Sequence, residues 1–346
     1  MVKRGFWFGI LTMVLISGMM FTGCSNGSPN DKISTDGTDG VWAAVKKLPF
    51  HSIGGIVWGN GKFVIVGRDD MTLATKAAYS TDGINWTEIT DTLFNAAFYN
   101  STFYGIASSN NMFVVVFDYV TAAYSYDGIT WAMSGDTTFP YDSSIISSIA
   151  WGDNKFVAVG DHGHTAYSMD GINWIPVVNS KLDDGIINIA WCNNMFMAIG
   201  HNNNDYYYHV AFSSDGVNWA AVTDTTFNDI FAYSYTFSIA WGNNKFVVVG
   251  NDGSTAAYSS DGIHWTAITD TTFNNTFTDA YFLNIAWGNN KFVAVGDNGK
   301  AAYSADGIHW TAVTDTTFNN HFISAIAWGN NKFVAVGAGI AYWSGN

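Results

Sequence analysis

The sequence predicts an all-β protein, a single seven-bladed β-propeller of four-stranded blades, on three observations. A two-strand motif recurs seven times, a turn motif built on aspartate recurs six times, and both ends of the repeat array are incomplete. The composition agrees, because 35 glycines with only four prolines indicate many tight turns between strands. Charged residues make up only 12% of the chain, so most of it must fold around an apolar core.

The first half of each repeat is a predicted β-hairpin, seen most clearly at 285–296. Two apolar segments flank the turn Gly288-Asn289-Asn290, and Gly-Asn-Asn sequences favour tight hairpin turns. The second segment is apolar without alternation, as expected for an inner strand buried on both faces between stacked blades. The motif tryptophan recurs in six copies, and the seventh copy is a degenerate one at 105–117. These tryptophans are Trp58, Trp151, Trp191, Trp241, Trp287 and Trp328. Six intervals separate Trp58 from Trp328, which lies 270 residues later, so the mean period is 45 residues.

The second half of each repeat is a turn in which a serine precedes an aspartate by two positions and a tryptophan follows it by four. The six aspartates are Asp82, Asp127, Asp170, Asp215, Asp261 and Asp306. These copies resemble the Asp-box (BNR-like) turn of sialidases and other Asp-box propellers, although that family has one more residue before the aromatic. We expect the aspartate and serine to accept hydrogen bonds from the turn backbone, and the tryptophan to pack beneath it. Six copies indicate a structural role, because one catalytic site needs one constellation.

The two incomplete ends of the repeat array complement each other. The last hairpin is followed by 340–344, which resembles a third strand, and 41–45 resembles the fourth strand of a blade. We therefore expect 41–45 to supply the outer strand of the blade that 324–344 begins. Such a closure hides both edges that would otherwise be open. The alternative is an open ring of six blades and a fragment.

The N-terminal residues look like a bacterial lipoprotein signal peptide. Lys3 and Arg4 precede an apolar stretch that is short for a membrane span and ends in Phe21-Thr22-Gly23-Cys24. We expect a signal peptide at 1–23, lipidation of Cys24, a flexible tether at 24–39 and the propeller at 40–346. An ordinary signal peptide with a chance cysteine is the alternative. The expected location is the cell envelope, at the outer membrane or cell surface rather than the inner membrane.

Charge and cysteine content narrow the classes of partner. The net charge is −14, and no basic stripe offsets it, so nucleic acid is excluded as a partner. The one cysteine besides Cys24 is Cys192, which replaces the glycine that follows the motif tryptophan. We expect it to be a buried free thiol rather than a nucleophile. A monomer is expected.

Candidate ligand-binding residues lie in the longer loops, on the face opposite the aspartate turns. Loops on a rigid scaffold usually carry function, and these loops differ between blades. The tyrosines chosen are Tyr99, Tyr141, Tyr206, Tyr207, Tyr233, Tyr235 and Tyr281. Aromatic rings beside Asn and Asp suit glycans and protein partners alike. The alternative is that these rings cover the core beneath the loops. The shared Asp-Thr-Thr-Phe element of several loops is interpreted as packing.

The sequence gives little support for catalysis or cofactors. The resemblance to sialidases implies an arginine triad and a tyrosine–glutamate pair, but the chain after the signal peptide has one arginine, Arg68, and one glutamate, Glu88. A pair of non-repeat aspartates could still make a glycosidase or lyase. His162, His164, His201 and His209 do not complete a recognised metal spacing, so no metal or other cofactor is expected.

The sequence therefore favours a non-catalytic envelope lipoprotein that presents a propeller to a glycan or protein ligand. An extracellular carbohydrate-active enzyme other than a sialidase is one alternative. An assembly factor for an envelope complex is another.

Overall fold

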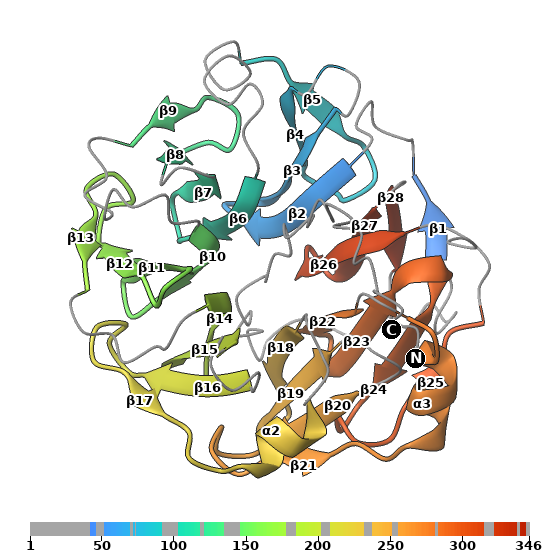
Figure 1. Cartoon of the computed structure of the whole chain (residues 1–346). Coiled ribbons are helices and arrows are strands. Elements are labelled where there is room, and N and C mark those ends of the chain that lie inside the picture. The colour runs from blue at the N-terminus through green and yellow to red at the C-terminus, as the bar shows by residue number, and fades with distance from the viewer. Residues whose placement is uncertain are drawn as a thin grey trace, which may run out of the picture.

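The structure is a computed structural model that describes residues 42–45, 52–69, 72, 74–91, 103–117, 121–134, 146–177, 185–201, 208–231, 237–250, 255–280, 283–314, 322–337 and 340–343. In these ranges the chain forms seven four-stranded antiparallel sheets. The sheets follow one another around a central axis, each with its first strand nearest the axis (Figure 1). The chain is a β-propeller.

Six sheets are each built from four consecutive strands. The first three are β2 (Ser52–Gly59), β3 (Lys62–Arg68), β4 (Thr75–Ser80) and β5 (Thr87–Ile89); β6 (Phe103–Ser108), β7 (Phe113–Phe117), β8 (Thr121–Ser125) and β9 (Ala132–Met133); and β10 (Ile146–Gly152), β11 (Lys155–Gly160), β12 (Thr165–Ser168) and β13 (Ile175–Pro176). The next three are β14 (Gly185–Cys192), β15 (Met195–His201), β16 (Tyr208–Ser213) and β17 (Ala220–Ala221); β18 (Phe237–Gly242), β19 (Lys245–Gly250), β20 (Ala256–Ser259) and β21 (Thr266–Ala267); and β22 (Leu283–Gly288), β23 (Lys291–Gly296), β24 (Ala301–Ser304) and β25 (Thr311–Ala312).

The remaining sheet is composite. It contains β26 (Ile323–Gly329), β27 (Lys332–Gly337) and β28 (Ile340–Trp343), and its outer strand is β1 (Trp42–Ala44). Trp42 is opposite Trp343 in an antiparallel register, so the two ends of the described chain meet in one sheet. The Trp42 side chain is only 2% exposed and packs among residues of β23, β24 and β26. The N-terminal strand therefore joins the ring by backbone pairing and by burial of a large aromatic ring.

The predicted fold needs one correction, because the all-β chain also contains a few short helices that were not expected. Helices α2 (Thr226–Ile230) and α3 (Thr271–Phe277) follow the outer strands β17 and β21, and a short 3₁₀ turn η2 (Asp297–Gly299) follows β23. Asp270 caps α3 by accepting a hydrogen bond from the Phe273 N–H. The Asp-Thr-Thr-Phe sequences at the start of these helices were expected to pack, but not to start helices.

The core lies between neighbouring sheets rather than inside any one of them. The second strands, such as β7 and β23, are buried along nearly their whole length. Each apolar cluster combines residues of adjacent sheets, as where Val64 and Val66 of β3 pack with Phe113 and Val115 of β7. No sheet has a core of its own, so the stability of each one depends on its neighbours.

A belt of buried polar side chains links the inner strands near the axis. The Ser238 hydroxyl donates to Asn284 Oδ1 at 3.2 Å, and the Asn284 amide donates to the Ser324 carbonyl at 3.1 Å. The Ser324 hydroxyl donates to the Ile53 carbonyl at 2.5 Å, which connects the composite sheet to the β2–β5 sheet. These bonds satisfy polar groups that could not otherwise be buried, so they fix the relative positions of neighbouring inner strands.

Candidate functional site

The loop tyrosines chosen from the sequence all lie outside the described residues, so the structure does not place them. Their described neighbours cover the core. Phe231 and Phe277 are fully buried, and Phe227 and Phe273 pack against Trp265 and Trp310 with ring centroids 5.2 and 5.0 Å apart. In these two loops the aromatic residues pack into the interface between one sheet and the next.

The six repeat aspartates share one hydrogen-bond pattern. In the first copy, Asp82 Oδ1 accepts from the N–H groups of Ile84 and Asn85 at 2.8 and 2.7 Å and from the Ser80 hydroxyl at 2.9 Å. Ser80 in turn accepts from the Gly83 N–H, and Gly83 has the left-handed φ of +73° that the turn needs. These hydrogen bonds to the carboxylate all come from its own turn.

These bonds also set the charge of the aspartates. Burial alone would raise the pKa of Asp170, but the hydrogen bonds from Asn173 and Ile172 outweigh it and lower the pKa to about 2. The same balance lowers the pKa of Asp82, Asp127, Asp215 and Asp306, and at Asp261 the bond from His264 is the largest contribution. A general acid at neutral pH needs the opposite shift. The geometry suits permanently ionised turn residues.

The hairpin turns between the first and second strands lie on the same face as the aspartate turns and are bonded to them. Asn60 Nδ2 donates to the Tyr126 carbonyl at 2.9 Å, and Lys62 Nζ donates to the Asp127 carbonyl at 2.7 Å. Asn243 and Asn330 make the equivalent bonds to Ala305 and Thr81. The repeated polar residues therefore fasten each sheet to the next one along the ring.

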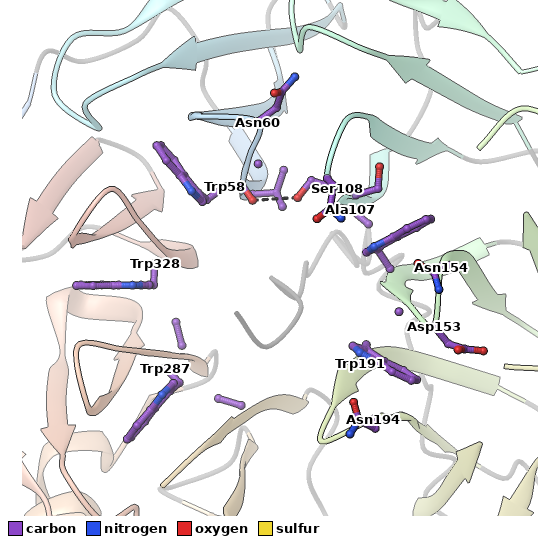
Figure 2. A pocket seen from close by; sticks show the side chains of 18 of the residues that line it. Trp58, Asn60, Ala107, Ser108, Asp153, Asn154, Trp191, Asn194, Trp287 and Trp328 are labelled. Carbon is purple, nitrogen blue, oxygen red and sulfur yellow. Dashed lines mark hydrogen bonds between the residues drawn. The ribbon is translucent and has the colours of Figure 1, made fainter. Parts of the chain in front are cut away.

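A cavity of about 680 Å³ opens at the centre of this face, where the hairpin turns surround the axis. Its lining differs from one side to the other (Figure 2). The polar side chains of the lining come from the sheets from β2 to β17, namely Asn60, Ser108, Ser109, Asn110, Asp153, Asn154 and Asn194. The same sheets also contribute Val57, Trp58, Ala107, Trp151 and Trp191, and the sheets from β18 to β28 contribute Ala240, Ile285, Ala286, Trp287 and Trp328. Tryptophans therefore line the cavity from both sides, whereas its polar side chains are confined to one, although the ring is built from similar repeats.

The motif tryptophans are wedged between sheets around this cavity. A Cβ added to Gly152 would lie 2.0 Å from the Trp191 ring, and one added to Gly288 would lie 2.1 Å from the Trp328 ring. At these positions the indole therefore lies directly on the glycine of the preceding sheet. It also packs against the phenylalanine opposite it, as Trp191 does against Phe196 at 4.5 Å between centroids. A side chain at either glycine would overlap the ring unless the ring or the strand moved.

Ser108 is the exception in this ring. Ser108 is opposite Phe113 in the β6–β7 register, so it occupies the position that a tryptophan holds in the other six sheets. The Ser108 hydroxyl instead donates to the Trp58 carbonyl at 2.9 Å, and its side chain lines the cavity (Figure 2). The sequence showed this copy as degenerate, but the position of Ser108 on the axis could not be seen without the strand register.

Cys192 departs from the sequence expectation. It is buried, as predicted, and it occupies the glycine position beneath Trp241. Its thiol is not free, however, but disulfide-bonded in the structure, to a partner outside the described residues.

Three further features bear on function. Within the described ranges, no group of three His, Cys, Asp or Glu side chains is placed to hold a metal ion. In the same ranges, no helix is long and apolar enough to cross a membrane. Glu88 lies on the outer strand β5, where it pairs with Lys76 at 2.8 Å, so the glutamate acts as a surface ion-pair partner.

Comparisons with known proteins give the fold. No protein-family model matches the chain, and no curated protein matches it by sequence. Among solved structures it is similar to YCF48 bound to D1 peptide, with 15% identity and a TM-score of 0.66 over 91% of this chain and all of that one. It is also similar to YCF48 from Cyanidioschyzon merolae, with 15% identity and a TM-score of 0.63 over 87% of this chain and 98% of that one.

A third similar structure is the extracellular domain of the one-component system BT4673 from B. thetaiotaomicron, with 12% identity and a TM-score of 0.60. The match covers 88% of this chain and 40% of that one. At these identities the similarity shows a shared propeller architecture. It leaves the Asp-box resemblance and the lipoprotein signal as sequence-based expectations.

Proposed function

We propose that this chain is a non-catalytic, lipid-anchored cell-envelope protein whose propeller is a binding scaffold for a protein or glycan ligand. The observation that carries the proposal is the central cavity, which is lined by tryptophan, asparagine and serine and held by a ring of mutually fastened sheets. Rigid positioning of aromatic and amide groups is what a binding site requires.

The described carboxylates support binding rather than hydrolysis. The repeat aspartates are ionised and bonded within their turns, and Glu88 is paired with Lys76 at the outer edge. A glycosidase needs one carboxyl group that stays protonated near neutral pH and a second across a cleft. The similar YCF48 structure is a complex with a peptide, and it is consistent with the same kind of role.

The proposed anchor and location rest on the sequence around Cys24. A Cys24→Ser variant should be released from the membrane fraction, whereas the parent chain should stay with it. Equal fractionation of the two would contradict the anchor and leave the binding role untouched.

The binding role is tested with the mature protein on a glycan array and by pull-down from solubilised envelopes. Retention of a defined ligand without chemical change is the expected result. Release of a cleaved product from a retained glycan would overturn the non-catalytic assignment.

A further inference from the structure

The ring of tryptophans around the central cavity has a single gap, at Ser108. Gly59 still occupies the position on which a tryptophan would lie, and its added Cβ would be 2.5 Å from Ser108 Cβ and 3.2 Å from Phe113 Cε1. The glycine of the repeat is kept while its tryptophan is absent, so a small hydroxyl side chain lines the cavity where the other sheets carry an indole.

The hydroxyl at this gap is fixed rather than mobile, since it donates to the Trp58 carbonyl. Beside it, Asn110, Asn154 and Asn194 line the cavity and are exposed. Across the opening lie Trp287 and Trp328 (Figure 2), and Ala286, the residue before Trp287, also lines the cavity. A ligand in the cavity would meet exposed amide groups on one side and tryptophans on both sides.

The orientation of the tryptophans decides which ligand class fits. A sugar ring stacks on the face of an aromatic ring. Here an indole has one face on a glycine of the preceding sheet and packs against a phenylalanine of its own sheet, as Trp58 does between Gly329 and Phe63. This packing leaves little of the ring face open for a sugar to stack on.

Amide side chains and indole edges instead match a peptide. An asparagine amide both donates and accepts, as does a peptide group, and an indole edge offers an N–H donor and apolar carbon. A chain with a net charge of −14 repels acidic segments and attracts basic ones.

We infer that the gap at Ser108 is the entry point of a peptide-binding site in the central cavity, which takes an extended segment of neutral or positive charge. The segment places its backbone against the asparagines and its apolar side chains against Trp287, Trp328 and Ala286. This inference rests on the proposed binding role and gives it a site and a ligand class.

The test restores the missing tryptophan. The mature protein is used to select binders from a phage library of random peptides, and dissociation constants of the selected synthetic peptides are measured by calorimetry. Ser108→Trp should fold, because Gly59 leaves space for an indole as the glycines of other sheets do. Thermal unfolding checks this. The substitution should weaken binding about tenfold or more, since it fills the pocket at the centre of the site.

Two variants act as controls. Ser108→Ala removes the hydroxyl but keeps the gap, so it should bind nearly as the parent does. Ser214→Trp adds an indole to the same face away from the cavity, at an exposed position equivalent to that of Tyr126, and should leave affinity unchanged.

The outcomes separate the site from the general role. Selected peptides that bind Ser108→Trp and the parent equally would overturn the inference while leaving a binding role elsewhere on the ring. Failure to select any peptide, with retention of a glycan on the array, would replace the ligand class. Failure to retain any ligand in either assay would count against the proposed function as well.

Discussion

Substituting the glycine beneath a motif tryptophan tests how the sheets are joined. Gly242 is the chosen position because it has an ordinary φ and its neighbour is a side chain. A Cβ at Gly242 would lie 1.9 Å from Trp287 Cδ2, 2.2 Å from Cε3 and 2.4 Å from Cε2. These distances are far inside van der Waals contact, so in Gly242→Ala either the Trp287 ring or the inner strand β18 must move.

The expected loss follows from two opposing effects. Overpacking of this kind costs about 1–3 kcal/mol. Replacing glycine by alanine also restricts the unfolded chain, which returns about 0.4–1 kcal/mol. The net expectation is a loss of about 1–2 kcal/mol, which lowers the melting temperature by roughly 2–6 °C in a domain of this size.

The assay is a double-mutant cycle measured by thermal and urea unfolding. The same Gly242→Ala change is made in a Trp287→Ala background, where the clashing ring is gone. The loss should then largely disappear, and the coupling between the two positions should be about 1 kcal/mol or more. If Gly242→Ala lowers the free energy of unfolding equally in both backgrounds, the glycine is not needed to make room for the Trp287 ring and the reasoning is wrong.

Three other predictions follow from the joints and the termini. Ser324→Ala removes the donor to the Ile53 carbonyl at the joint of the composite sheet, and it should lower the free energy of unfolding by about 1–3 kcal/mol in urea titrations; an unchanged midpoint would exclude that bond as a stabilising one. His264 and His309 bond to Asp261 and Asp306, which raises the pKa of both histidines above 6.5. Their contribution is therefore full below that value and is lost as the pH rises through the folded-state pKa, so the melting temperature of the parent should fall across this range while that of His264→Asn/His309→Asn stays flatter. Asparagine stands at the same position in three other copies, and equal pH profiles would refute the linkage. Finally, Cys192 is disulfide-bonded in the structure, so denatured protein produced without lipidation should take up a maleimide only after reduction; equal uptake without reductant would contradict that bond.

The sequence predicted the repeat unit well because the unit is local. The strands around Asn289-Asn290 and the turn after Ser304 depend on residues a few positions apart, and the pairing of 41–45 with the chain end could be inferred from two incomplete repeats. The described helices α2 and α3 were missed because Asp-Thr-Thr-Phe reads equally well as a loop, and only burial of Phe227 and Phe273 against the next sheet favours a helical turn.

The site was less predictable than the fold. Ser108 appeared only as a weak copy of the motif, and its meaning depends on strand register and on the closed ring that brings distant repeats to one axis. The repeat asparagines were likewise expected to make turns, but their bonds run to the following sheet across more than one repeat length of sequence, as from Asn60 to Tyr126, 66 positions apart. Contacts of that range leave no local pattern.

The composite sheet also has a mechanical consequence. Among the described residues, the N-terminal end of the chain joins the ring through β1, a strand of three paired residues. Any tension between an attachment at the N-terminus and a ligand held by the ring is therefore borne first by those three pairs and by the burial of Trp42. Under load the β1–β28 strand pair would separate before any of the six continuous sheets is disturbed.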